Sequence, residues 1–160
     1  AAYHIRWRVM DAFGERPPGV PDDGRLIAFP TPERLAEATL EELQSCGLSR
    51  RKAEYIRGLA TAVADGELDL DELRDMPDDE ARTFIIDWRG FGPWSADYIL
   101  VRGLGRPDCV PADDLGVRTV VGEYLGDGSR MTADEVREAL AAFKPYRGLT
   151  AFYLLGASQL

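Results

Sequence analysis

The chain has 160 residues, of which 45% are hydrophobic, and a formal net charge of −9 at pH 7. This length and composition are typical of one folded domain, or of two small lobes that share a cleft. No apolar run approaches the roughly 18 residues that cross a membrane, and the opening residues lack the apolar core of a signal peptide. Two cysteines, Cys46 and Cys109, are too few for a disulfide framework or a four-cysteine metal site. We therefore expect a cytoplasmic protein without a membrane partner.

Helix start and stop signals recur along the chain, and no run alternates as a strand does. They predict an all-α protein of about nine short helices and one further turn. The predicted helices cover residues 3–13, a short segment from Thr31, 39–47, 49–65, 78–87, 93–104, 114–124, 132–143 and a last segment from Arg147, with the extra turn within 69–76 and a Pro/Gly-rich loop over 14–30. On the helix over 49–65, the spacing directs Ala53, Ile56, Ala60 and Val63 inward.

Residues 78–104 form a predicted helical hairpin whose two helices are joined at Gly90-Phe91-Gly92. Glycine permits backbone angles and a close approach that a side chain would forbid, so such a turn can press its amides against a phosphate. The helix that opens at Pro93 adds unpaired N–H groups and the positive end of its dipole. We predict a phosphate site made of Gly90, Phe91, Gly92, Pro93 and Ser95. An ordinary tight turn is the alternative.

Asp113 and Asp114 follow after one helix and a loop, and can return to the same place as the hairpin. A carboxylate beside a phosphate site suggests chemistry on nucleic acid. Asp114 also stands where a helix to Tyr124 begins, and aspartate is a common N-cap residue. The capping and chemical roles can coexist.

The acidic net charge argues against nucleic acid as a partner, because most DNA-binding domains present a basic face. One face can still be positive, and main-chain amides bind phosphate without formal charge. We predict Arg89 and Arg118 as phosphate contacts, with Lys144 and Arg147 as further candidates. Each of these side chains taken alone is more often a solvated charge.

The order of helix, Gly-Phe-Gly hairpin, Pro-Trp-Ser-Ala helix and Pro-Ala-Asp-Asp resembles the helix-hairpin-helix (HhH-GPD) superfamily of DNA glycosylases, and most of all its 3-methyladenine DNA glycosylase II group. Further matching segments are Phe29–Glu33, Gly47–Ala53, Leu100–Gly105 and Lys144–Gly148. The resemblance implies a two-lobed helical core with a cleft between the lobes. It also implies a monomer that binds double-stranded DNA containing a damaged base, associated with the nucleoid if the source is bacterial.

The resemblance assigns the catalytic carboxylate to Asp114, with Asp113 as a structural or secondary partner beside the base pocket. Such a carboxylate stabilises the positive charge that builds on the sugar when the glycosidic bond breaks. Bifunctional members carry a lysine where this chain has Trp94, so the resemblance implies a monofunctional enzyme without lyase activity. It implies no required cofactor, but a cation held at the hairpin by the main-chain carbonyls of Trp88 and Phe91.

Trp94 and Tyr98 stand four residues apart, so they share one helix face. An alkylated purine carries positive charge, and electron-rich rings attract cations, so we predict that both rings line the base pocket. The alternative is that both rings belong to the core.

The family's opening helix starts earlier than this chain, so we expect residues 1–160 to be one glycosylase core, or a piece of one that lacks an amino-terminal segment. The family's late base-stacking aromatic aligns with Leu155, and Tyr153 is the nearest ring. We expect excision of alkylated purines in base excision repair. A glycosylase for a deaminated or oxidised base, or a non-catalytic helix-hairpin-helix DNA-binding protein, are the alternatives.

Overall fold

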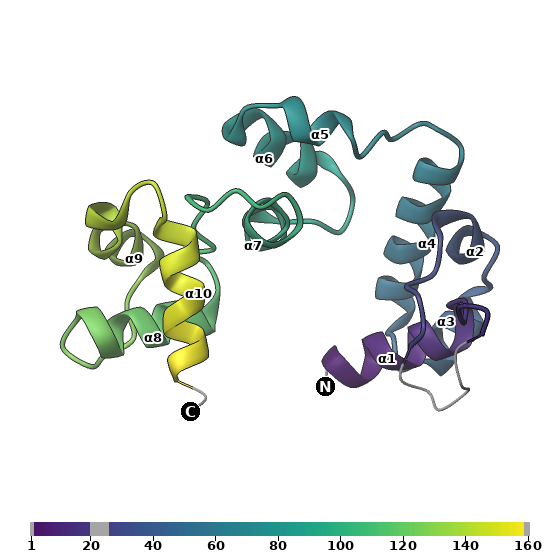
Figure 1. The fold of residues 1–160 in the computed structure, drawn as a ribbon, viewed down its shortest axis with the longest axis horizontal. Coiled ribbons are helices and arrows are strands. Elements are labelled where there is room, and N and C mark those ends of the chain that lie inside the picture. Colours follow the sequence, from purple (N-terminus) through teal and green to yellow (C-terminus); the bar gives the residue numbers. More distant parts are fainter. Residues whose placement is uncertain (1, 20–25, 159–160) are drawn as a thin grey trace. The chain divides into compact units, whose positions relative to one another are not determined.

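A computed structural model of the chain describes residues 2–19 and 26–158, and part of the predicted loop over 14–30 lies outside them. The described residues form helices and no strand, which confirms the predicted all-α class (Figure 1). The helices are α1 (Ala2–Phe13), α2 (Pro32–Ala36), α3 (Leu40–Ser45), α4 (Arg50–Ala64), α5 (Glu72–Asp75), α6 (Asp78–Asp87), α7 (Pro93–Tyr98), η1 (Ile99–Gly103), α8 (Leu115–Leu125), α9 (Ala133–Ala139), η2 (Ala141–Phe143) and α10 (Arg147–Ala157). Among these described helices, none has the length and apolar character needed to span a membrane.

Short polar side chains define where five of the helices begin. The side-chain oxygen of each N-cap accepts a hydrogen bond from the backbone N–H three residues later, which satisfies one of the free donors of the first turn. These N-caps are Thr31, Thr39, Ser49, Asp114 and Thr132. The observed starts therefore agree with the starts predicted from the sequence.

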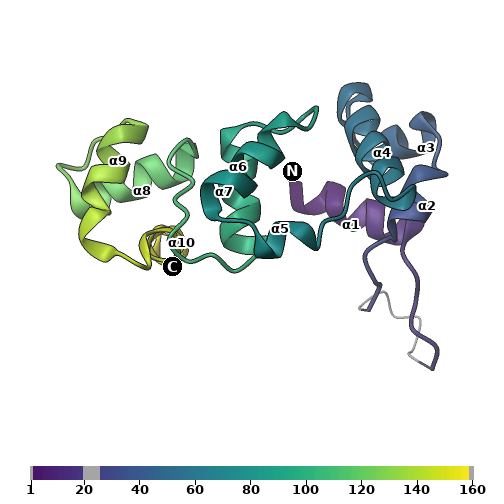
Figure 2. The ribbon, with the colours of Figure 1, turned by 90° about the horizontal axis from the view of Figure 1, so that it is seen from above.

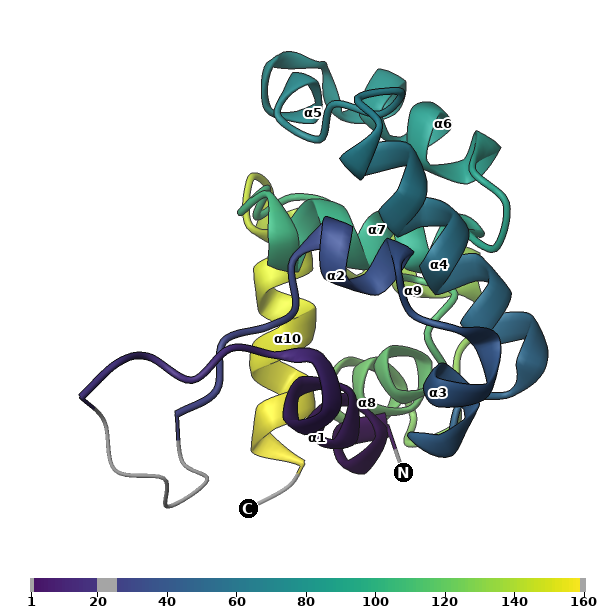
Figure 3. The same cartoon turned by 90° about the vertical axis from the view of Figure 1, so that its right-hand side faces the viewer.

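The chain divides into two compact units, residues 1–70 and 71–160. In the first unit, α2 and α3 both pack against α4 (Figure 3). Its core includes Val9, Phe13 and Leu43 together with two alanines of α4, Ala53 and Ala60. Of the predicted inward face of α4, Ala53 and Ala60 are buried and half-buried Ile56 packs against the same core, whereas Val63 is half-buried. The cleft predicted between two lobes stays a prediction.

The second unit has two hydrophobic clusters. One lies between α6 and α7 and includes Ala81, Ile85 and Leu100. The other joins α8, α9 and α10 through fully buried side chains such as Val117 and Val136. Figure 2 shows α6 lying beside α7, and α8 close to α9 and α10. These two clusters position the segment 111–114, which runs between the hairpin and α8.

Two predicted helices differ from the observed ones in how the last turn is wound. After Tyr98 the helix widens into a π-helical turn, in which the N–H of Leu104 donates to the carbonyl of Ile99 at 3.0 Å. The predicted helix over 132–143 instead tightens into the 3₁₀ turn η2, where the N–H of Phe143 donates to the carbonyl of Leu140 at 3.0 Å. The α-, π- and 3₁₀-helical windings use the same residue types, so the hydrophobic pattern of the sequence does not distinguish them.

Candidate active site

Asp114 lies at the start of α8 and uses both carboxylate oxygens. Its Oδ1 accepts the backbone N–H of Val117 at 3.0 Å, which is the predicted helix cap. Its Oδ2 accepts the indole N–H of Trp94 at 2.6 Å, across 20 positions of sequence. The acid is thus in direct contact with the second helix of the hairpin.

Trp94 begins an aromatic series that continues to half-buried Tyr98 and Phe152. The residue is 45% exposed, and its ring centroid lies 5.2 Å from that of Tyr98 at an interplanar angle of 40°. Tyr98 in turn meets Phe152 of α10 edge to face, with centroids 5.2 Å apart. The Arg102 guanidinium lies 5.3 Å from the Phe152 ring centroid. Trp94 is therefore the solvent-exposed member of the series, whereas the Tyr98 ring packs between the Trp94 and Phe152 rings.

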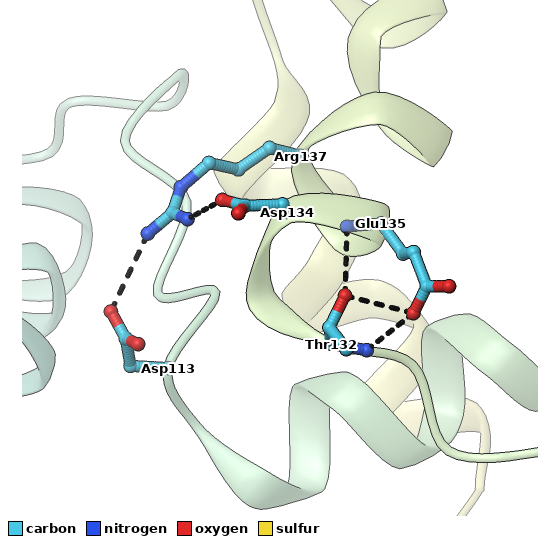
Figure 4. Close-up of polar contacts among 5 residues, drawn as sticks. All are labelled: Asp113, Thr132, Asp134, Glu135 and Arg137. Atoms are coloured by element: carbon cyan, nitrogen blue, oxygen red, sulfur yellow. Dashed lines mark hydrogen bonds and ion pairs between the residues drawn. The ribbon is translucent and has the colours of Figure 1, made fainter.

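Asp113 points to a different element from its neighbour Asp114. Its Oδ2 lies 3.4 Å from Nη2 of Arg137, whose Nη1 pairs with Asp134 at 2.8 Å (Figure 4). Figure 4 also shows the capping box that starts α9, formed by Thr132 and Glu135. Arg137 thus links the loop before α8 to α9. The structural or secondary role expected of Asp113 and its place in the base pocket stay predictions.

The hairpin turn has the backbone form that its glycines predicted. Gly90 has a φ of +104°, where a side chain is strained, and the N–H of Phe91 donates to the carbonyl of Trp88 at 3.1 Å. Gly92 is the N-cap of α7, and a Cβ added to it would meet no atom within 4 Å. Pro93 has no N–H, so the unpaired donors of the first turn include the amide of Ser95. Phosphate binding here stays a prediction.

Two of the arginines predicted to contact phosphate have partners inside the second unit. Nε of Arg118 donates to the carbonyl of Met131 at 2.7 Å. Arg147 forms a two-bond ion pair with Asp108, which holds the pKa of that carboxyl below its usual range. Arg89 and Lys144 are exposed.

The sequence analysis missed an ion pair between a buried aspartate and a half-buried arginine, which joins the two helices of the hairpin. Asp97 of α7 is only 5% exposed, and its Oδ1 accepts Nε of Arg82 from α6 at 2.7 Å. Burial raises the pKa of Asp97, although Arg82 opposes the shift. The signal was present, because Asp97 is a charged residue beside the inward-facing Ala96. Arg82 and Asp97 also line a cavity of about 490 Å³ whose lining does not include Trp94 or Asp114.

The sequence analysis also missed Gly116, in the first turn of α8. A Cβ added to Gly116 would lie 3.0 Å from Oδ1 of Asp114 and 3.1 Å from Cδ2 of Leu155. A side chain here would therefore press directly on the carboxylate. A glycine two residues after a capping aspartate was the available signal.

The hairpin and the carboxylate bound to its second helix define a helix-hairpin-helix protein of the base excision repair type. The chain belongs to the HhH-GPD superfamily of base excision DNA repair proteins, whose family model matches residues 1–145.

Known proteins of this superfamily are similar to the chain over most of its length. It is 32% identical over 154 residues to a DNA-3-methyladenine glycosylase of Bacillus subtilis, covering 96% of this chain and 50% of the relative. The solved 3-methyladenine DNA glycosylase of Archaeoglobus fulgidus matches with a TM-score of 0.82 and 35% identity, covering 96% of this chain and 50% of that one. A Schizosaccharomyces pombe 3-methyladenine DNA glycosylase, solved in complex with abasic DNA, matches with a TM-score of 0.74 and 25% identity, covering 99% and 81%. The chain thus spans about half the length of the first two proteins.

Proposed function

We propose that the chain is the catalytic core of a DNA glycosylase that excises alkylated purines. The observation that carries the proposal is the contact between the Asp114 carboxylate and the half-exposed Trp94 ring on the second hairpin helix. Relatives named for 3-methyladenine excision, at 32% and 35% identity, support the same substrate class. The S. pombe relative was solved with DNA, which supports double-stranded DNA as the partner of this chain. We expect it to act as a monomer.

In the proposed reaction, the bond between C1′ of the sugar and the purine nitrogen breaks, and its electron pair leaves with the base. The sugar then carries positive charge, which the fixed carboxylate of Asp114 stabilises. Water adds to C1′, and its proton passes to the solvent. An alkylated purine is already cationic, so it leaves without strong acid catalysis and is attracted to the open face of Trp94. Tyr98 and Asp113 complete the proposed pocket, with Tyr98 as the ring behind Trp94.

We propose that the enzyme is monofunctional and leaves an intact abasic site. A lyase of this superfamily uses a lysine amine at the position of Trp94, and the only lysines of this chain are Lys52 and Lys144. Borohydride treatment during the reaction should therefore trap no covalent complex between enzyme and damaged DNA. A trapped complex would contradict this part of the proposal.

The hairpin turn is the proposed binding site for the DNA backbone. The amides around Gly90, Gly92 and Ser95 would bind one phosphate. Arg89, which directly precedes the turn, and Arg118, which lies in α8, are the proposed side-chain contacts to phosphate. The carbonyls of Trp88 and Phe91 are the proposed donors for a cation. The Trp88 carbonyl already accepts one hydrogen bond, from Phe91, and its second lone pair is the one that suits this role. Such a cation would strengthen the attraction to phosphate.

Base release from defined duplexes tests the proposed function. Oligonucleotides carrying 7-methylguanine, hypoxanthine or 8-oxoguanine are incubated with the protein and then cleaved with alkali at abasic sites. We expect cleavage for the alkylated purine first. Asp114→Asn should slow release by about 10²-fold or more, because the amide still caps α8 but carries no negative charge.

The matched control is Asp134→Asn, which removes a largely exposed carboxylate from the first turn of another helix of the same unit, α9. This variant should keep the activity of the unchanged protein. An Asp114→Asn variant with full activity would remove Asp114 from the mechanism. Failure to release any base, together with binding to undamaged duplex, would favour the non-catalytic DNA-binding alternative.

A further inference from the structure

The carboxylate of Asp114 has one local anchor and one distant anchor. The N–H of Val117 holds Oδ1 at 3.0 Å, but this bond alone leaves the carboxylate plane free to rotate about χ2, which is a soft torsion in aspartate. The indole N–H of Trp94 holds Oδ2 at 2.6 Å and so removes that rotation. Each carboxylate oxygen keeps one further acceptor position for a substrate or water.

The donor is itself held in place by packing. The Trp94 ring lies against Tyr98 at 5.2 Å, and Tyr98 lies against Phe152 of α10 at 5.2 Å. The position of the indole nitrogen is therefore set by three rings from two helices rather than by the Trp94 rotamer alone. The tilted contact of Trp94 with Tyr98 and the edge-to-face contact of Tyr98 with Phe152 add stabilisation beyond the apolar area that they bury.

We infer that Trp94 is a positioning residue for Asp114, which acts through its indole N–H, and that Tyr98 and Phe152 fix the direction of that donor. This inference rests on the proposed function and adds a second role to the stacking role of the same ring. Misplacement of a catalytic group by about 1 Å slows a reaction by about 10²-fold. Loss of the donor should therefore slow the chemical step even when the ring surface is kept.

An isosteric replacement separates the donor from the ring. Placing 3-benzothienylalanine at position 94 alone, by codon suppression, keeps a two-ring side chain but puts sulfur where the N–H was. We expect the single-turnover rate of base release to fall by about 10-fold to 100-fold, with little change in the dissociation constant for lesion DNA. Trp94→Phe should lose the same rate and also bind lesion DNA more weakly, because the stacking surface is smaller. An unchanged rate in the isosteric variant would overturn the inference.

The bracing rings are tested in the same assay. Phe152→Leu keeps an apolar side chain but removes the edge that Tyr98 meets, so the single-turnover rate should fall by about threefold to tenfold. In the background of the isosteric variant, the same substitution should cause no further loss, because no donor remains to be directed. Equal losses in both backgrounds would show that Phe152 acts on stability and not through Trp94.

A spectroscopic measurement separates this inference from the proposed function. The chain has three tryptophans, so its indole N–H resonances are few and are assigned with single Trp→Phe variants. Asp114→Ser keeps an N-cap oxygen for Val117 but has no second oxygen for Trp94. We expect the Trp94 resonance to move upfield in this variant and to stay in place in Asp113→Asn. A resonance insensitive to Asp114→Ser would overturn the inference even if the protein releases bases. If no lesion is released but the resonance does move, the proposed function fails while the anchoring of Asp114 by Trp94 stands.

Discussion

Asp114 shows that one carboxylate can cap a helix and bind the hairpin at the same time. The cap uses Oδ1, and the oxygen left over is the one that Trp94 binds. The sequence analysis gave capping and catalysis as two roles of Asp114 that can coexist. The geometry brings both donors to one carboxylate without competition, because each takes a different oxygen.

Gly116 offers a test of how tightly the carboxylate is confined. Gly116→Ala places a methyl group 3.0 Å from Oδ1 of Asp114 and 3.1 Å from Leu155, so one of them must shift. We expect base release to slow by about 10-fold, while stability changes by less than about 1 kcal/mol because alanine favours the helix. The control is Gly156→Ala in α10, where an added Cβ meets nothing within 4 Å. Equal activity in the two variants would show that the carboxylate tolerates the displacement.

The ion pair between half-buried Arg82 and buried Asp97 leads to a prediction about stability and pH. Arg82→Met leaves the buried Asp97 carboxylate without its partner, so we expect a loss of about 1–2 kcal/mol in the free energy of unfolding at pH 7. Burial already raises the pKa of Asp97 above its ordinary value of 3.8, and loss of Arg82 should raise it further. A raised carboxyl pKa favours the folded state at low pH, and this contribution disappears as the pH rises through the folded-state pKa.

The loss of stability in Arg82→Met should therefore shrink as the pH is lowered from 7 toward 4, where Asp97 takes up a proton. Urea unfolding at several pH values measures this. The double variant Arg82→Met, Asp97→Leu should regain most of the stability and lose the added pH dependence. A loss of the same size at every pH would contradict the role assigned to Asp97.

At the scale of the elements, the hairpin depends on its two glycines for different reasons. Gly90 has a φ of +104°, which is unfavourable for any residue with a side chain, whereas Gly92 has a φ of −130° that any residue can adopt. Gly90→Ala should thus lower the free energy of unfolding by about 1–2 kcal/mol, measured by thermal or urea unfolding. Gly92→Ala should leave stability nearly unchanged.

Gly92→Ala should nevertheless weaken binding to duplex DNA if the hairpin grips a phosphate. Its added Cβ would point into open space, which is where a DNA backbone would approach. Fluorescence anisotropy with a labelled duplex measures the dissociation constant. Unchanged binding in Gly92→Ala would argue that the glycine turn serves the fold alone.

For the whole molecule, the net charge of −9 predicts a shallow dependence of DNA binding on salt. Several arginines of the second unit already pair with aspartates, namely Arg82, Arg106, Arg137 and Arg147. These pairs reduce the number of cations in the second unit that can release counterions from DNA, so we expect a slope of log K against log salt of about −2 to −3. A slope steeper than about −6 would show that many more phosphates are neutralised by side chains.

The sequence by itself determined the helices and most of their first residues. Caps such as Thr39, Ser49 and Asp114 bind backbone donors three positions away, so the information is local and is read directly from the chain. The hairpin glycines and the motif around Trp94 and Asp114 likewise indicate the family from the sequence alone.

Only the tertiary structure decided which side chains touch. The bond between Trp94 and Asp114 spans 20 positions, the stack from Tyr98 to Phe152 joins α7 to α10, and Asp97 meets an arginine of α6. Such contacts depend on how several helices pack around shared hydrophobic clusters. The helix propensity of a local segment does not determine that packing. The windings of η1 and η2 were also undetermined, because α, π and 3₁₀ turns differ by one residue per hydrogen bond and use the same side chains.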